Sequence, residues 1–346
     1  MSTQFAPMPV RLEDVTALEE CMTSPSPALI ADLARLDGDF MVLGVGGKMG
    51  PTLARMAKRA APDKRVVGVA RFSEPGLREK LESQGIECIA CDLLDRAALE
   101  RLPRVRNVVF MAGHKFGAGG NPAFTWAMNA GVPFMVAETF CESRIVCFST
   151  ICVYPYVEVD GPGANESTRA EPPAGDYANS CVGREQMFLY GSGKWGTAGR
   201  LVRLSYAIDM RYGVLHDVAT SVFNGHAVDV TMGYVNVIWQ GDANEHALRL
   251  LANCTTPTSP INITGPRRVS VRWLAGEFAN RFGKTATVTG SEAPTAWIVD
   301  TSEAQRLLGS PGVSLETMID WTADWIARGG ASLGKATHFQ TRDGKY

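Results

Sequence analysis

Three glycines near the start of the chain have a spacing that suits phosphate binding. In the stretch "GVGGKMGP", Gly44, Gly47 and Gly50 directly follow an apolar run and precede a helical pattern. Glycine allows a tight turn and a close approach to a pyrophosphate, while the N-terminus of the following helix offers N–H donors and a positive dipole end. We predict a dinucleotide-binding loop that includes Lys48 and Met49; the alternative is an ordinary glycine-rich turn.

The residues after the second apolar run bear on which dinucleotide would bind. In "GVARFS", Ala70 stands where a site that prefers NAD usually has an acid for the ribose 2′-hydroxyl. Without that carboxylate, Arg71 can pair bidentately with a 2′-phosphate and Ser73 can add a hydrogen bond, so we expect NADP, with NAD as the alternative. Arg71 could instead be a solvated residue that stacks on adenine. Asp92, beside Leu93 in "CDLLD", is placed to meet the adenine amino group.

The elements that must position these residues follow from an alternation that begins at residue 39. Predicted strands alternate with helical patterns and read "DFMVLGVGG", "KRVVGVAR", "IECIACD", "RNVVFMAG", "SRIVCFST" and "GRLVRLSYAID". Such continuous apolar runs, separated by helices, indicate a parallel sheet that is covered on both faces. The predicted fold class is therefore α/β, a doubly wound parallel sheet (Rossmann) with a smaller mixed C-terminal substrate region.

Domain boundaries are predicted from where this alternation starts and fades. Residues 1–38 are expected to be an N-terminal helical extension, and residues 39–205 a dinucleotide-binding Rossmann domain. Residues 206–346 are expected to form the substrate-binding region, although 233–265 should return to the Rossmann sheet because "SPINITG" is one more strand pattern. The polar tail 331–346 is expected to be loose.

Composition excludes several classes of function. The formal charge is 34 − 36 = −2 and no basic stripe stands out, so nucleic acid is not an expected partner. No apolar run reaches the ~18–20 residues that cross a bilayer, and the N-terminus lacks a signal-peptide pattern, so we expect a cytoplasmic protein without a membrane partner. Cys88 and Cys91 are spaced C-x-x-C but lie within a predicted strand, so buried structural thiols are expected rather than a metal site.

The order of these motifs resembles the extended short-chain dehydrogenase/reductases, the NAD-dependent epimerase/dehydratase family, over roughly residues 39–330. The glycine loop and Asp92 match this family's cofactor motifs. "MAGHKFG" is similar to its fourth-strand segment beside the cofactor, which implies cofactor contacts for Ala112, Gly113 and Lys115. "YVNVIWQGD" and "INITG" resemble later segments of the same family.

Two further segments resemble the family's catalytic motifs. "FSTICVYP" is similar to its S-S-x-x-V-Y-G stretch, which places Thr150 on the catalytic Ser/Thr. "ESTRAEPPAGDYANSCVGRE" is similar to the segment that ends in Y-x-x-S-K-x-x-x-E. Tyr177, Ser180 and Glu185 match that segment, but Cys181 stands at the position of the lysine. In such a site Tyr177 takes or gives a proton and Thr150 holds the substrate oxygen.

What the resemblance implies is an NAD(P)-dependent oxidoreductase or epimerase that acts on a sugar or sugar-derived substrate by tyrosine-assisted hydride transfer. Family members commonly dimerise through two long helices, here near 122–140 and 177–190, so a homodimer is expected. Two alternatives stay open. One is a cofactor-binding sensor or regulator with little or no turnover, and the other is a lyase or isomerase that uses the cofactor transiently.

The cysteine raises the question of how Tyr177 would work. A free phenol has a pKa near 10; a lysine would lower it and also hold the nicotinamide ribose. Losing about two pKa units of such help costs roughly tenfold to a hundredfold in rate at pH 7. Lys115 could substitute or could contact phosphate only, and the charge of the oxidised nicotinamide could also help. Arg184 and Lys194 are other nearby cations, and Cys181 could itself be a base or nucleophile, or an inert packed thiol.

Three more residues are substrate-binding candidates beside Thr150 and Tyr177. His114 lies next to the predicted pocket, either as an acid/base group or as a satisfied loop histidine. Arg203, in "LVRLS" where a strand emerges, could meet a substrate anion or pair with a carboxylate. Trp239 could line the pocket, although tryptophan in such a setting is by default a core residue.

Overall fold

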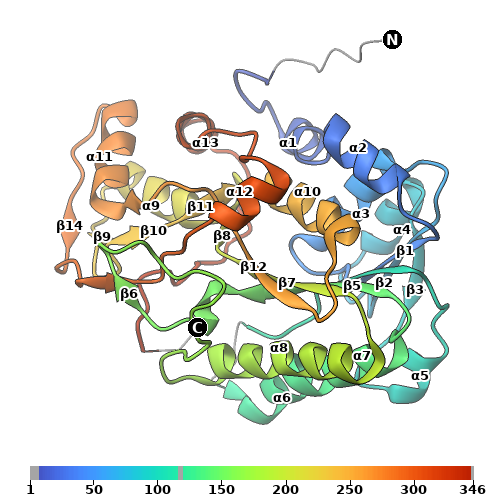
Figure 1. Ribbon diagram of the computed structural model, residues 1–346. Coiled ribbons are helices and arrows are strands. Elements are labelled where there is room, and N and C mark those ends of the chain that lie inside the picture. The colour runs from blue at the N-terminus through green and yellow to red at the C-terminus, as the bar shows by residue number, and fades with distance from the viewer. Residues whose placement is uncertain (1–7, 116–119, 344–346) are drawn as a thin grey trace.

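The computed structural model describes residues 8–115 and 120–343, and within them a parallel sheet of seven strands forms the centre of the fold (Figure 1). Its strands are β1 (Phe40–Leu43), β2 (Val66–Ala70), β3 (Glu87–Ala90), β4 (Asn107–Phe110), β5 (Arg144–Thr150), β7 (Gly199–Leu204) and β12 (Ser259–Ile263). They lie in the order β12-β7-β5-β4-β1-β2-β3, and every neighbouring pair is parallel. The predicted doubly wound α/β fold is thus confirmed.

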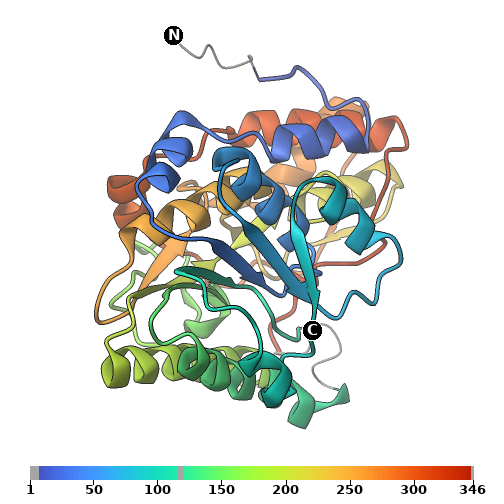
Figure 2. The same cartoon turned by 90° about the vertical axis from the view of Figure 1, so that its right-hand side faces the viewer.

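Helices cover both faces of this sheet, as the view turned by 90° shows (Figure 2). They are α2 (Pro27–Ala34), α3 (Gly50–Ala60), α4 (Leu77–Ser83), α5 (Arg96–Glu100), α7 (Val132–Thr139), α8 (Asp176–Trp195), α10 (Gln240–Leu250) and α12 (Ser302–Leu308). Apolar side chains from α2, α3, α4, α10 and α12 pack on one face, and those from α5, α7 and α8 pack on the other. Because helices cover both faces of the sheet, ligands can reach it only at the ends of its strands.

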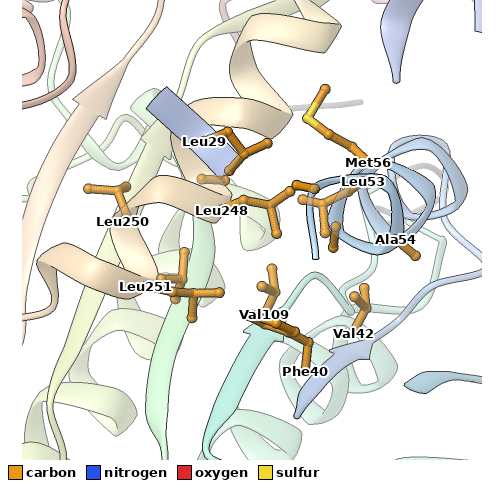
Figure 3. Packing of buried hydrophobic residues seen from close by; sticks show 14 of the residues in the cluster. Leu29, Phe40, Val42, Leu53, Ala54, Met56, Val109, Leu248, Leu250 and Leu251 are labelled. Atoms are coloured by element: carbon orange, nitrogen blue, oxygen red, sulfur yellow. The ribbon is translucent and has the colours of Figure 1, made fainter. Parts of the chain in front are cut away.

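Strand β1 illustrates how the sheet separates two apolar cores. Phe40 and Val42 belong to the cluster that includes Leu53 of α3 (Figure 3). Met41 and Leu43, which alternate with them, belong to the cluster on the opposite face. Successive strand side chains point to opposite faces, and burying each large apolar side chain stabilises the fold by about 1.5–3 kcal/mol. The continuous apolar run in the sequence therefore reflects two cores rather than one.

The long helix predicted near 122–140 is interrupted by a π-helical turn. It consists of α6 (Pro122–Trp126), the π turn Ala127–Gly131 and α7. Pro133 has no N–H to donate to the carbonyl four residues earlier, which favours a widened turn here. Within the π turn the buried Asn129 reaches α8, where its amide nitrogen donates to Ser180 Oγ at 2.9 Å.

After β7 the chain leaves the sheet and builds a second region around its own apolar cluster, while β12 returns to the sheet. Its paired strands are β8 (Tyr206–Ile208) with β11 (Val237–Trp239), β10 (Tyr234–Val235) with β13 (Val269–Ser270), and β9 (Val228–Asp229) with β14 (Val288–Thr289). A further pair, β6 (Val157–Glu158) with β15 (Thr295–Ala296), lies in a separate small apolar cluster. The helices of the second region are α1 (Val15–Met22), α9 (Val214–Phe223), α11 (Val271–Phe282) and α13 (Leu315–Ala327). Leu18 and Met22 of the N-terminal α1 belong to the same apolar cluster as α13, and Arg328 at the end of α13 donates to the carbonyl oxygens of Leu12 and Glu13 just before α1.

The C-terminal segment packs against the rest of the protein, although its polar composition predicts a loose tail. Residues 331–343 have no helix or strand, but the backbone N–H and the hydroxyl of Thr337 both donate to Asp217 Oδ2, at 2.8 and 2.6 Å. Further along, the guanidinium of Arg342 lies 4.0 Å from the centre of the Tyr156 ring. These contacts hold the segment in place without secondary structure of its own; residues 344–346 lie outside the described part of the chain.

Candidate active site

Two cavities lie at the carboxyl ends of the sheet strands, which is where parallel α/β sheets bind ligands. The first, of about 330 Å³, lies beyond β1, β2, β3 and β4, and we call it the β1–β4 cavity. The second, of about 220 Å³, lies beyond β5 and β7, and we call it the β5–β7 cavity. The β1–β4 cavity is lined by Gly44, Gly46, Gly47, Val69, Ala70, Arg71, Phe72, Ser73, Glu74, Leu77, Cys91, Asp92, Leu93, Met111, Ala112, Gly113 and Met128.

The glycine loop shapes the β1–β4 cavity in two ways. Gly44 has a φ of 92°, and a Cβ there would lie 2.6 Å from the backbone nitrogen of Ala112. A Cβ on Gly50 would lie 2.4 Å from the carbonyl oxygen of Val45. These two glycines are therefore required by the fold itself. Gly47 is different: the nearest atom to a Cβ there is 3.5 Å away, so its small size leaves room for a ligand.

Arg71 and Ser73 lie exposed at the rim of the β1–β4 cavity, on either side of Phe72. Phe72 has a φ of 52°, in the left-handed region that non-glycine residues adopt at a cost of about 1–2 kcal/mol. Its ring packs against the core cluster that contains Leu77, which holds the turn in place. The turn presents Arg71 and Ser73 to one cavity, together with the carboxylate of Glu74.

Asp92 stands at the end of β3 with one side of its carboxylate occupied. Its Oδ1 accepts a hydrogen bond from the backbone N–H of Leu94 at 3.0 Å, which fixes the side chain in an exposed position at the cavity. Leu93 is buried beneath it. Asp92 and Leu93 thus lie in the same cavity as the glycine loop.

Tyr177 and Thr150 meet in the β5–β7 cavity. This cavity is lined by Lys48, Met49, Lys115, Ser149, Thr150, Ile151, Cys152, Tyr177, Leu204, Ser205, Tyr206, Ala207, Tyr212, Gly213 and Thr337. The side chains of Thr150 and Cys181 lie beside the Tyr177 hydroxyl and interact with it. Thr150 is itself held at the end of β5, because its Oγ1 accepts from the backbone N–H of Cys152 at 3.2 Å.

The surroundings of Tyr177 keep its phenol neutral. Burial raises its pKa well above the usual value of 10, and the nearby thiols of Cys181 and Cys152 act in the same direction, whereas Arg184 and the bond from Thr150 lower it. Burial also raises the pKa of Cys181, which is 0 % exposed, to about 11. At neutral pH Cys181 is therefore a packed thiol, and this geometry argues against the hypothesis that it is a base or nucleophile.

Lys115 is the candidate to replace the lysine that this sequence lacks at position 181. It follows β4, and its Nζ lies 5.6 Å from the centre of the Tyr177 ring inside the β5–β7 cavity. Burial lowers its pKa. Lys48 extends from the glycine loop into the same cavity, with its Nζ 4.2 Å from the centre of the Tyr212 ring. Lys194, by contrast, is exposed in the last turn of α8.

Arg184 is a buried cation one turn beyond Cys181 on α8. Its guanidinium donates to the carbonyl oxygen of Phe148 at 2.8 Å and to Oδ1 of Asn129 at 2.7 Å. The same Asn129 donates to Ser180 Oγ, so its amide joins the π turn to α8, and Arg184 joins α8 to β5. This network sets the position of the helix that carries Tyr177 and uses the guanidinium of Arg184, which the sequence identifies only as a nearby cation.

The structure does not bring three predicted substrate residues to the β5–β7 cavity. Arg203 is buried and donates to both carboxylate oxygens of Glu185, at 3.0 and 2.6 Å, so the carboxylate alternative is the one observed. Trp239 is 2 % exposed and packs edge-on against Trp321, because β11 points it into the second core. His114 lies just outside, with Nδ1 3.0 Å from Oγ1 of Thr125.

Several residues that line the β5–β7 cavity were not predicted from the sequence. Ser205 and Tyr206 directly follow β7, and the rule that ligands bind at the carboxyl ends of parallel strands could have identified them. Tyr212 and Thr337 could not have been found in this way, since they reach the cavity from a turn and from the C-terminal segment. Lys48 was assigned to the phosphate loop, but its side chain lies among the β5–β7 residues.

Comparison with known families gives one match. Residues 40–208, a little under half of the chain, match the model of the NAD dependent epimerase/dehydratase family. This segment runs from β1 to β8 and contains both the glycine loop and Tyr177. No curated protein sequence matches the chain. None of the helices in the described residues is both long and apolar enough to cross a membrane.

Solved structures resemble the fold closely at low sequence identity. A dTDP-glucose 4,6-dehydratase from Streptomyces venezuelae, with NAD and TYD bound, superposes with a TM-score of 0.71 at 19% identity over 84% of this chain and 97% of its own. A UDP-glucose 4-epimerase from Thermotoga maritima, with UDP-glucose, gives 0.70 at 18% over 84% and 99%. An epimerase from Methanothermobacter thermautotrophicus gives 0.72 at 18% over 87% and 96%. These similarities establish the fold.

Proposed function

We propose that the chain belongs to the NAD dependent epimerase/dehydratase family and is an NAD(P)-dependent oxidoreductase or epimerase of a sugar or sugar-derived substrate. The observation that carries this proposal is the placement of Tyr177 and Thr150, side by side, in a cavity that Lys48 and Met49 of the glycine loop also line. The match of residues 40–208 to the family model supports it. So do the NAD and nucleotide sugars in the similar structures.

The residues of the β1–β4 cavity fit a nicotinamide dinucleotide. Gly47 leaves space beside the N-terminus of α3, where backbone N–H groups favour a pyrophosphate. Arg71 and Ser73 share the rim with no acid at position 70, which favours NADP; Glu74 at the same rim could instead serve a ribose hydroxyl. We propose NADP as the preferred cofactor, and the similar structures show that this fold also accommodates NAD.

A bound cofactor supplies hydride chemistry at its nicotinamide ring, and the chain's own residues would handle the proton. Thr150 would orient the substrate oxygen toward Tyr177, whose hydroxyl would exchange the proton with that oxygen. The high pKa of this phenol keeps it protonated at neutral pH, so a proton is present to be donated but the ionised form that accepts one is scarce. Lys115 is the cation placed to assist when Tyr177 must accept a proton, because its Nζ lies over the phenol ring.

A cofactor-binding regulator with little turnover is the second candidate. It is favoured by the observation that burial raises the pKa of Tyr177 well above 10, while Cys181 supplies no positive charge to lower it. The two candidates differ in turnover and not in cofactor binding, so they can be separated by kinetics.

The test compares the wild type with Tyr177→Phe and Cys181→Lys in cofactor binding, and in cofactor oxidation and reduction across sugars, sugar acids and nucleotide sugars. We expect all three proteins to bind the cofactor. Tyr177→Phe should lower the rate about 10²–10⁴-fold, the range for general acid–base groups. Cys181→Lys should raise it about tenfold or more by restoring a cation beside the phenol.

Tyr190→Phe is the matched control, since Tyr190 lies on the same helix but is half exposed on the far side of α8 from the cavity residues. The enzyme proposal fails if the wild type binds cofactor, turns over none of the panel and is unchanged by Tyr177→Phe. That result would leave the regulator.

A further inference from the structure

The β5–β7 cavity carries an excess of positive charge beside Tyr177. Lys48 and Lys115 both line it, and among its described lining residues none is Asp or Glu. The remaining polar groups are hydroxyls and a thiol, which can bind a polyhydroxy compound but cannot neutralise a cation. Two ammonium groups in one small cavity repel each other, and each lowers the affinity of the other for its proton.

Lys48 is directed to the substrate side of the molecule rather than to the dinucleotide side. It begins in the glycine loop, but its Nζ reaches the carbonyl oxygen of Ala207 at 3.4 Å and the face of the Tyr212 ring at 4.2 Å. Ala207 and Tyr212 line the β5–β7 cavity, whereas Lys48 does not line the β1–β4 cavity with Arg71. A 3.4 Å contact to one neutral carbonyl and one ring face leaves the ammonium with donor capacity for an anion.

The C-terminal segment contributes part of the wall of the same cavity. Thr337 is one of the lining residues, and it is held by two hydrogen bonds to Asp217. Further along, Arg342 donates to the carbonyl oxygen and to Oγ1 of Thr295, at 2.7 and 2.8 Å. The enclosed volume is about 220 Å³, below the ~300–1,000 Å³ typical of pockets for drug-sized ligands. This space suits one sugar-sized molecule and not a sugar joined to a nucleotide.

From these observations we infer that Lys48 binds a carboxylate or phosphate group of a small polyhydroxy substrate that is not linked to a nucleotide. The inference rests on the proposed function for the reaction, but the anion site itself stands on Lys48, Lys115 and the enclosing tail. Lys115, whose Nζ lies 5.6 Å from the centre of the Tyr177 ring, assists the phenol, and Lys48, beside Ala207 and Tyr212, orients the substrate through its charge. The nucleotide sugars of the structurally similar enzymes would then be poor ligands of this chain.

The test measures binding to the full-length protein saturated with NADP, using D-glucuronate, D-glucose 6-phosphate, D-glucose and UDP-glucose as probes. We expect one of the two anionic probes to bind at least tenfold more tightly than D-glucose and UDP-glucose; which of the two it is decides between carboxylate and phosphate. Lys48→Met should weaken that probe at least tenfold and leave D-glucose unchanged. Lys48→Arg should retain part of the affinity, because it keeps the charge.

Lys194→Met is the matched control, as it removes one positive charge from the exposed end of α8. The affinity for NADP is measured on every variant. If Lys48→Met weakens NADP binding tenfold and leaves binding of the anionic probe unchanged, Lys48 binds the cofactor and the inference is overturned. Equal binding of D-glucose, or preferred binding of UDP-glucose, overturns it as well. If the anionic probe binds through Lys48 but no cofactor is reduced or oxidised, the proposed function fails while the anion site stands.

The pH dependence of probe binding gives a second readout. The titratable and charged groups that face Lys48 are Lys115 and, after β7, Tyr206, Asp209, Arg211 and Tyr212. Packing around the side chain lowers the pKa of Lys48 to about 8; Asp209 opposes this shift, and Arg211 and Lys115 add to it. Anionic probe binding should therefore weaken as pH rises through 8 in the wild type, and this step should vanish in Lys48→Met.

Discussion

At the scale of single residues, the candidate site is defined by which charged groups lie near Tyr177. Cys181 contributes none, since burial raises the pKa of its thiol to about 11. The two cations near the phenol come from other places: Lys115 from the loop after β4, and Arg184 from the next turn of α8. Arg184 is committed to Phe148 and Asn129, so Lys115 is the cation with access to the cavity.

Replacing Lys115 by methionine should make Tyr177 a weaker base. Without the ammonium the pKa of the phenol rises further, and each added unit lowers the basic fraction about tenfold at neutral pH. We expect kcat/KM in the oxidative direction to fall about tenfold at pH 7, and the deficit to shrink as pH rises and the phenol ionises. The pH profile of kcat/KM measures this. A deficit that is constant from pH 6 to 10 would show that Lys115 acts only in binding.

The sequence was informative about single residues where a local rule applied. Gly44, Gly47, Arg71, Asp92, Thr150 and Tyr177 all line the cavities. Arg203 and Trp239 do not, because the side on which a strand-end side chain emerges depends on partners such as Glu185 and Trp321 that lie far along the chain. Such pairs are fixed by tertiary packing, which one sequence does not display.

At the scale of elements, the alternation of strands and helices was predictable because each strand of the sheet is buried on both faces and each helix on one. The interruption of the helix near 122–140 was not predicted, although Pro133 marks it in the sequence. The departure of β8 from the sheet was also missed, since "LVRLSYAID" reads as one continuous strand. In both cases the apolar pattern continues through a change in backbone geometry.

Two glycine variants should separate folding from cofactor binding in the loop after β1. Gly44→Ala places a methyl 2.6 Å from the Ala112 nitrogen at a φ of 92°, so we expect a loss of about 1–3 kcal/mol of stability. Gly47→Ala meets no atom closer than 3.5 Å and should melt like the wild type. Its affinity for NADP should nevertheless fall at least tenfold, because the methyl occupies ligand space.

Calorimetric melting and NADP titration of the two proteins provide the comparison. Normal cofactor affinity in Gly47→Ala would mean that the phosphate does not approach this glycine, and the loop would then be an ordinary turn.

At the scale of the whole molecule, both ends of the chain are used to join its parts. The N-terminal α1 shares an apolar cluster with α13, and residues 331–343 run from Arg211 past Asp217 to Tyr156. None of this was evident from composition, because a segment rich in Ser, Thr, Gly and Lys has the character of a free tail. Its order comes from a few side-chain contacts to distant residues.

Loosening the tail should widen the range of substrates. In Arg342→Met the two hydrogen bonds to Thr295 and the contact with Tyr156 are lost, and in Thr337→Val one of the two bonds to Asp217 is lost. We expect the double variant to keep its melting temperature within a few degrees, since neither side chain is part of the large apolar clusters. UDP-glucose should gain affinity relative to the wild type.

Limited proteolysis measures release of residues 331–343, and titration with UDP-glucose measures access to the β5–β7 cavity. A released tail without any gain for UDP-glucose would show that the cavity is small for reasons other than its C-terminal wall. Lys335→Met, a change within the segment at a residue that does not line the β5–β7 cavity, is the control.

The wall formed by Thr337 also has an evolutionary consequence. The residues that hold the cofactor and the proton belong to strands and helices whose side chains are locked into the cores, so few substitutions there preserve the fold. The segment 331–343 contributes little to those cores, with Phe339 as its main buried apolar side chain. Lengthening, shortening or recoding it changes the space beside Tyr177 at small cost in stability. Substrate range can thus diversify between descendants of this chain through its last residues, while the reaction centre stays constant.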